Sequence, residues 1–156
     1  MSVYNIYKYF ETLHHIVHLS TFGIVGENKL RTLLWLCDKA NYLQCGKTIS
    51  HKIYIKKIFG PDPEHFYIGK TDFENEEVLT YRPSRLFSEE EREYISLREP
   101  ECFSLAPEEQ EIILHTVALY AAATLEEVRR IARCRAWEIT ELNKLIPMQA
   151  VLERQP

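Results

Sequence analysis

The segment Glu27–Cys45 constrains the fold more than any other part of the chain, because apolar side chains leave it on nearly every side. These side chains belong to Leu30, Leu33, Leu34, Trp35, Leu36, Cys37, Ala40 and Leu43. Gly46 follows the expected end of the segment, where glycine often terminates a helix. The segment therefore predicts a central helix that other elements cover on all sides.

Further helices are predicted on both sides of this segment. Over residues 3–21 apolar side chains recur at three- and four-residue steps, and Gly23 and Gly26 end that pattern. Residues 47–59 suit either a short helix or a strand. We prefer a short helix that starts at Ser50.

Three more helix starts lie in the second half of the chain. Ser88 begins a capping box, which predicts a helix over about residues 88–97. Pro107 opens a longer helix, and Thr124 begins a second capping box for a helix that continues towards residue 137. Because the connection between the last two helices is short, they are expected to form an antiparallel pair.

The remaining pattern is a candidate hairpin. Residues 66–73 and 78–82 are rich in aromatic and β-branched side chains and could pair as two strands. The chain thus predicts a mainly α fold, a compact single-domain bundle of about six helices with one small β-hairpin. Residues 1–140 would form the domain, and residues 141–156 a short amphipathic C-terminal tail.

Composition and charge exclude several classes of function. The chain has 156 residues and a formal net charge of −4, so it lacks the excess of cations that marks most nucleic-acid binders. Its longest apolar run, residues 33–37, is far too short to span a membrane, and its first residues do not form a signal peptide. We therefore expect a cytoplasmic protein with no membrane partner.

The most enzyme-like local pattern is a group of histidines. His14 and His18 stand one helical turn apart, with His15 between them and Glu11 one turn earlier. A zinc protease of the H-E-x-x-H type needs a glutamate where His15 stands, and no third ligand is evident elsewhere. We expect no catalytic residue, no metal and no cofactor, and keep a metalloenzyme only as an alternative hypothesis.

One stretch resembles a known family. The residues that carry the resemblance are Lys29, Leu30, Leu33, Leu34, Trp35, Leu36, Asp38, Tyr42, Gly46, Ile49, Tyr54, Lys56, Gly60 and Pro61. Their order and spacing resemble the signature of the Panacea domain, the SocA-like antitoxin family. The resemblance covers about residues 28–61 well and is looser over residues 88–137.

The resemblance implies a function in a bacterial or prophage toxin–antitoxin system. Members of this family are compact helical antitoxins, often encoded beside the toxin, that neutralise it by direct protein–protein binding. One branch is thought to deliver its toxin to a protease as an adaptor. The implied partners are therefore a cognate protein toxin and, for an adaptor, a protease.

The motif residues also have physical roles that can be derived without the family resemblance. Asp38 lies on a largely apolar helix and needs a partner, such as a backbone N–H, Lys56 or a tyrosine hydroxyl, because an unpaired buried carboxylate is costly. Leucines would pack in the core, and glycines would allow turns. We therefore interpret the following motif residues as structural: Leu30, Leu34, Asp38, Tyr42, Gly46 and Gly60.

Contact with a partner is expected on other parts of the chain. Residues 54–66 combine aromatic and apolar side chains with a rigid turn, and the tail after Thr140 is amphipathic. Both segments are candidate toxin-binding surfaces. The candidate contact residues are Tyr54, Lys56, Phe59, Pro61, Phe66 and Tyr67.

A second hypothesis is a DNA-binding transcriptional regulator. It would use the helix over residues 124–137, which contains Arg129, Arg130, Arg133 and Arg135, as a basic helix against DNA. The net negative charge of the chain counts against DNA as a partner.

Overall fold

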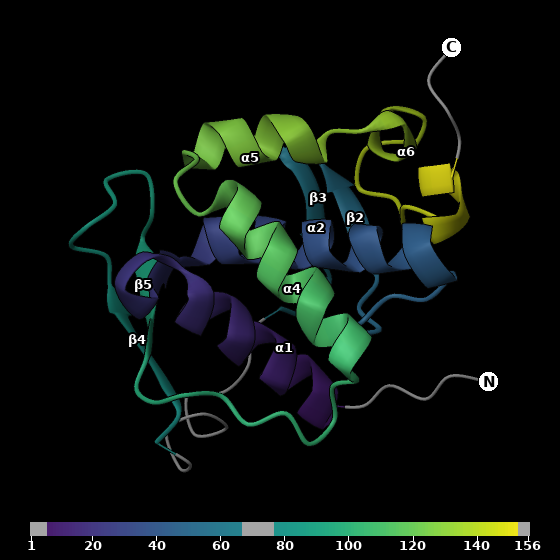
Figure 1. Ribbon diagram of the computed structural model, residues 1–156. Coiled ribbons are helices and arrows are strands. Elements are labelled where there is room, and N and C mark those ends of the chain that lie inside the picture. The colour runs from purple at the N-terminus through teal and green to yellow at the C-terminus, as the bar shows by residue number, and fades with distance from the viewer. Residues whose placement is uncertain (1–5, 67–76, 153–156) are drawn as a thin grey trace.

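The computed structural model describes residues 6–66 and 77–152 and is built around one helix, α2 (Glu27–Cys45). Three helices pack on α2: α1 (Ile6–Leu19), α4 (Pro107–Tyr120) and α5 (Leu125–Ala132). Figure 1 shows α4 crossing in front of α2, with α5 above it and α1 below. The predicted central helix is confirmed, and its leucines and Trp35 are buried.

Both ends of α2 follow from specific residues. Gly46 ends the helix in a left-handed conformation with φ of 75°. At the other end, the carboxylate of Glu90 accepts hydrogen bonds from the backbone N–H groups of Asn28 and Lys29, both at 2.8 Å. A Cβ at Gly26 would lie only 2.2 Å from Cγ of Glu90, so the cap requires glycine there.

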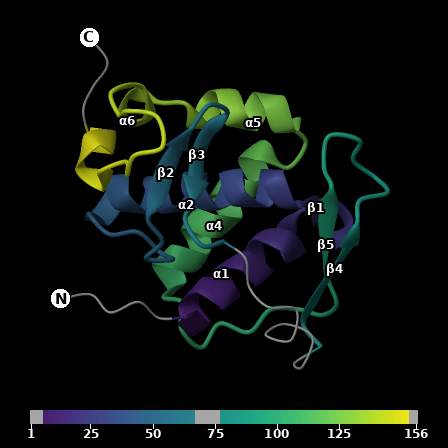
Figure 2. The ribbon, with the colours of Figure 1, turned by 180° about the vertical axis from the view of Figure 1, so that it is seen from behind.

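Two antiparallel sheets accompany the helices. The first has the order β1-β5-β4, formed by Ile24–Gly26, Arg92–Ser96 and Leu79–Pro83. The second is a hairpin of β2 (Tyr54–Lys57) and β3 (Gly60–Pro63). Seen from behind in Figure 2, the two sheets lie towards different ends of α2.

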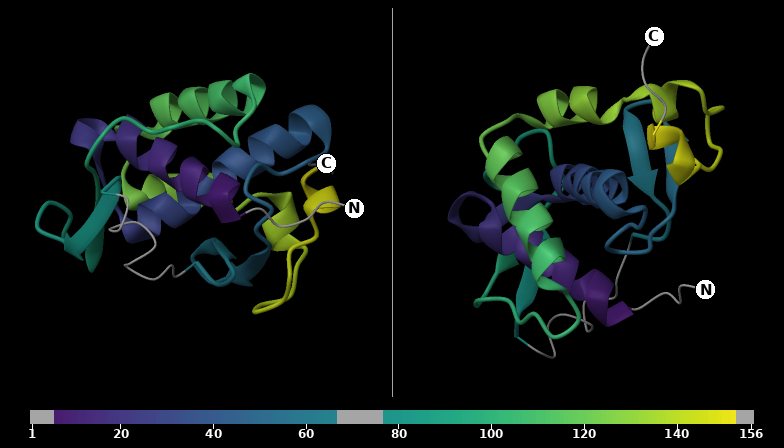
Figure 3. Two further views of the ribbon diagram at one scale, coloured as in Figure 1. Left: turned by 90° about the horizontal axis from the view of Figure 1, so that it is seen from below. Right: turned by 45° about the vertical axis from the view of Figure 1, so that its right-hand side comes forward.

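Short elements complete the described chain. A 3-10 turn, η1 (Thr21–Gly23), joins α1 to β1. After α5 come α6 (Arg135–Glu138) and a second 3-10 helix, η2 (Met148–Leu152). In the right-hand view of Figure 3 the β2–β3 hairpin lies beside the chain that runs from α6 to η2. No helix within residues 6–66 and 77–152 has the length and apolar character to cross a membrane.

The prediction of a mainly α bundle of about six helices is wrong. The structure is mixed α/β, with 49% of the described residues in helices and 16% in strands. The largest error falls on the helix expected over residues 88–97, where Arg92–Ser96 forms the middle strand of a sheet. Pairing with a strand on each side satisfies its backbone and outweighs the local capping pattern at Ser88.

Other local predictions also need correction. No helix starts at Ser50, because its backbone N–H and its hydroxyl both donate to Asp38, and β2 follows instead. Within residues 78–82 a strand does form, but its partner is β5. The other expected strand, residues 66–73, lies almost wholly outside the described residues. Helices α4 and α5 each pack mainly on α2, so they do not form the expected antiparallel pair.

Candidate partner-binding surface

The inner side of the β2–β3 hairpin is fixed to α2 by Asp38. Its Oδ1 accepts from the backbone N–H groups of Ile49 at 2.8 Å and Ser50 at 2.9 Å, and its Oδ2 accepts from the hydroxyls of Ser50 and Tyr54. Burial raises the pKa of the Asp38 carboxyl, and these hydrogen bonds oppose the rise. The expected partners, backbone N–H groups and a tyrosine hydroxyl, are confirmed, whereas Lys56 is not among them.

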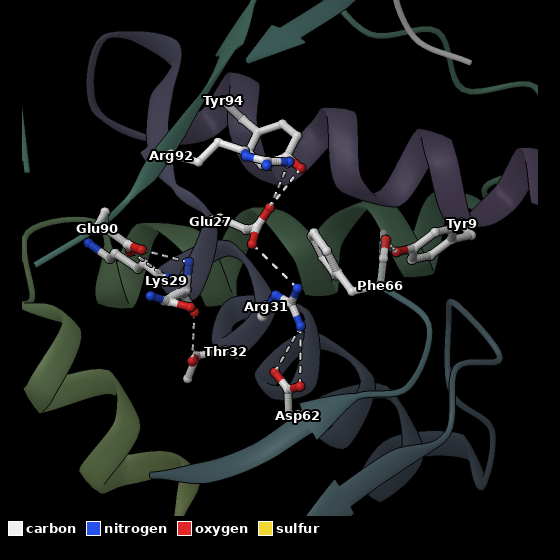
Figure 4. Close-up of polar contacts among 11 residues, drawn as sticks. Tyr9, Glu27, Lys29, Arg31, Thr32, Asp62, Phe66, Glu90, Arg92 and Tyr94 are labelled. Atoms are coloured by element: carbon white, nitrogen blue, oxygen red, sulfur yellow. Dashed lines mark hydrogen bonds and ion pairs between the residues drawn. The ribbon is translucent and has the colours of Figure 1, made fainter. Parts of the chain in front are cut away.

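A second link joins α2 to β3. Arg31 pairs with Asp62 of β3 (Nη1 to Oδ2, 3.2 Å) and with Glu27 of its own helix (Nη2 to Oε2, 3.3 Å), and its guanidinium lies over the ring of Phe66. Figure 4 shows Arg31 between the two carboxylates, with Tyr94 donating to Glu27 from β5. Each strand of the hairpin is thus attached to α2 through side chains.

The C-terminal tail lies along the outer edge of β2. Backbone hydrogen bonds run from Lys56 N–H to Lys144 C=O (2.9 Å), from Asn143 N–H to Lys56 C=O (2.8 Å) and from Ile146 N–H to Tyr54 C=O (2.8 Å). They bring Ile55 opposite Leu145 as an antiparallel bridge. The tail therefore extends the hairpin as an additional strand would.

A tryptophan strengthens this attachment. Trp137 Nε1–H donates to the backbone C=O of Lys57 at 2.8 Å, and the Lys56 ammonium lies 4.1 Å from the centroid of the Trp137 ring. We call β2, its turn and residues 137–146 the hairpin–tail surface. The first part of the predicted contact segment 54–66 and the predicted tail segment lie side by side in this surface.

Large aliphatic side chains are exposed on the hairpin–tail surface. Ile58, at the turn, is 78% exposed, and Leu145, on the tail, is 49% exposed. Lys57 and Lys144 stand among them, and Lys57 Nζ donates to Asn143 Oδ1 at 3.2 Å. Exposed aliphatic side chains next to charged groups are common on protein-binding surfaces. The exposed aliphatic residues of this surface are Ile58, Ile139, Leu142 and Leu145, and Ile53 is exposed just before β2.

The six predicted contact residues are divided by the structure. Tyr54, Pro61 and Phe66 are buried, whereas Lys56 and Phe59 are half-buried at the surface. Tyr67 lies outside the described residues. Sequence reasoning missed Ile58, Leu142 and Leu145. The strand interpretation of residues 47–59 could have signalled that Tyr54 points inward, but it gives no signal for these three residues, because Ile58 lies in the turn and the two leucines lie in the tail.

The structural interpretation of the motif agrees with the burial of its members. Leu30, Leu34 and Asp38 are fully buried in α2, and Tyr42 is half-buried near its end. Gly46 ends α2, and Gly60 begins β3.

Two of the four arginines of the alternative DNA-binding segment, Arg129 and Arg133, are engaged with the hairpin. The Arg129 guanidinium lies 4.2 Å from the centroid of the Phe59 ring, and Arg133 Nη1 donates to the Phe59 C=O at 3.1 Å. Glu126 and Glu127 stand on the first turn of the same helix. These contacts count against a free basic face for DNA.

The histidine group connects α1 to the chain around β5. His14 Nε2 lies 3.1 Å from Ser96 Oγ and 2.9 Å from the Arg98 C=O, and His18 Nδ1 lies 3.0 Å from the same Oγ. Burial lowers the pKa of His14 to about 4. In the part of the chain that the structure describes, no three His, Cys, Asp or Glu side chains are grouped to hold a metal ion.

Comparisons of the chain with protein-family models, with curated proteins and with solved structures found no match. The resemblance to the Panacea domain therefore stays a prediction based on the residues that carry it.

Proposed function

We propose that the protein is a cytoplasmic antitoxin that binds a cognate protein toxin through the hairpin–tail surface and so blocks the toxin's active site or access of its substrate. The family resemblance supports the class of function. The observation that carries the choice of surface is the backbone pairing of the tail with β2, which joins two candidate contact segments into one exposed aliphatic surface.

The physical properties of this surface suit a stable complex. Burying an exposed isoleucine or leucine completely contributes roughly 1.5–3 kcal/mol. The hairpin beneath Ile58 and Leu145 is held on α2 by Asp38 and Arg31, so little conformational entropy is lost when a partner docks. A rigid aliphatic patch of this kind can exclude water from a partner without any catalytic group.

Co-expression with the product of the neighbouring gene tests the proposal. If that product is toxic, the wild-type chain should restore growth, and an Ile58→Asp, Leu145→Asp double variant should not, because buried aspartates oppose docking. Leu119→Asp is the matched control, since Leu119 is 71% exposed on α4, away from the hairpin. A harmless neighbour, or equal protection by the double variant, would reject the proposal.

The protein could act on a bound toxin in two ways, by sequestering it or by delivering it to a protease as an adaptor. The lifetime of the toxin with and without the antitoxin distinguishes the two forms. Sequestration leaves the toxin present in an inactive complex, whereas delivery to a protease shortens its lifetime.

A further inference from the structure

The chain between β5 and α4 is fastened to α1 by side chains of that helix. We call residues 97–104 the β5–α4 segment, and Figure 1 shows it passing along α1. His14 Nε2 lies 2.9 Å from the C=O of Arg98. Farther along the segment, both carboxylate oxygens of Glu11 accept from the backbone N–H of Ser104 at 3.0 Å. Polar contacts thus hold the segment near each of its ends.

The β5–α4 segment buries little apolar surface. All of its residues are exposed or half-buried, and Phe103 is 87% exposed. The next buried side chain along the chain is Leu105. Since a segment with few buried apolar contacts has little hydrophobic stabilisation, its attachment to α1 depends on the polar contacts.

The contacts around Ser96 determine where the histidine protons lie. A carbonyl oxygen can only accept, so His14 Nε2 carries the proton that it donates to the Arg98 C=O. Ser96 Oγ donates to the same carbonyl at 2.9 Å and therefore accepts from His18 Nδ1 at 3.0 Å. These contacts need one N–H from each ring. A second proton on His14 would make it a cation that is only 5% exposed.

The surroundings of His14 oppose such a cation. Burial lowers its pKa to about 4, against the hydrogen bond to the Arg98 carbonyl, and the charges of His18, His15 and Arg98 act in the same direction as burial. Within the described residues, none of the charges that act on His14 lies on α2, α4 or β5. The carboxylate of Glu11 acts on His15 instead.

We propose that His14 is the proton-sensitive part of a latch that releases the β5–α4 segment from α1 as the pH falls from about 7 to about 5. In the released form water reaches His14, and its pKa returns towards the ordinary value of about 6.5. Release therefore takes up a proton between about pH 6.5 and about pH 4, so the open form gains population as the pH falls through that range. Below about pH 4 both forms are protonated and the gain ends.

Hydrogen exchange of the full chain, followed by NMR, tests the latch. The reporter is the amide of Ser104, which Glu11 holds on α1, and the reference is the amide of Trp35 in α2. With each rate corrected for the intrinsic effect of pH, Ser104 should be at least about 100-fold less protected than Trp35, because the segment opens without the rest of the fold. Its protection should fall about 20-fold from pH 7 to pH 5. Equal protection of the two amides, or unchanged protection of Ser104, would overturn the proposal.

A glutamine variant shows whether His14 is the responsible group. His14→Gln keeps a side-chain N–H for the Arg98 carbonyl but does not titrate, so the fall should shrink to about fivefold or less. The remainder is expected from His15, whose pKa burial also lowers. His115→Gln, at an exposed position on α4, is the matched control and should keep the full fall. An equal fall in His14→Gln and wild type would overturn the proposal.

Titration of the His14 ring in the wild-type protein decides the matter if the glutamine variant does not fold. A midpoint below about pH 5 is expected, and a midpoint near about pH 6.5 would overturn the latch. None of these measurements needs a toxin, so their outcome is independent of the proposed function.

Discussion

The two sides of the β2–β3 hairpin differ sharply. On the inner side, Tyr54 is fully buried and shares the Asp38 carboxylate with Ser50, and its ring meets Trp35 edge to face at 4.9 Å between centroids. On the outer side, the tail is attached mainly by backbone hydrogen bonds, and aliphatic side chains such as Leu145 face solvent. The comparison teaches that the motif residues build the support, while the exposed aliphatic side chains that we propose as the partner surface lie on the turn and the tail.

The largest effect should come from removing the inner anchor. Asp38→Ala would leave the N–H groups of Ile49 and Ser50 and the hydroxyl of Tyr54 without their acceptor inside the core. We expect a loss of about 3–5 kcal/mol in the free energy of unfolding, measured by urea denaturation. Glu138→Ala, at an exposed position, is the control and should change it by less than about 0.5 kcal/mol. Comparable stability of the two variants would contradict the role of Asp38.

An intermediate effect should come from loosening the tail. Trp137→Phe removes the hydrogen bond to the Lys57 carbonyl while keeping an aromatic ring beside Lys56. We expect a loss of about 1 kcal/mol in global stability. Hydrogen exchange at the amides of Lys56 and Ile146 should accelerate more than exchange in α2, because those amides hold the tail on β2. Uniform acceleration of hydrogen exchange across the chain would show that the tail does not detach from β2 independently of the rest of the fold.

The smallest effect should come from the exposed aliphatic side chains. Ile58→Ala should alter the free energy of unfolding by less than about 0.5 kcal/mol, since Ile58 is 78% exposed, and Leu145→Ala by less than about 1.5 kcal/mol, since Leu145 is about half exposed. Thermal unfolding provides the measurement. A loss of 2 kcal/mol or more, roughly that of a core truncation, would place these side chains in the core and remove the contrast between the two sides.

The parts of the fold that the sequence predicted are those with local signals. The bounds of α2 agree with the prediction because its apolar residues and Gly46 lie within one segment. The sheets could not be found in the same way. Arg92–Ser96 becomes a strand through pairing with Ile24–Gly26, a segment far away along the chain, and a local capping pattern at Ser88 says nothing about that contact.

The sequence predicted the segments that form the candidate site, but not which of their side chains are exposed. Residues 54–66 and the tail were both chosen for their apolar content, yet their hydrogen bonding to each other depends on long-range geometry. Tyr54 and Phe66 were favoured because aromatic residues are common at interfaces, and the structure buries both. The burial of Tyr54 depends on Asp38 accepting its hydroxyl, which has no sequence signature beyond the two residue types.

Hydrogen exchange of the protein with and without the proposed toxin partner tests the central claim most directly. Addition of the neighbouring gene product should slow exchange in β2, its turn and residues 137–146, which form the hairpin–tail surface, and leave the exposed face of α4 around Leu119 unchanged. Protection on α4 with no change along the hairpin and tail would contradict the account.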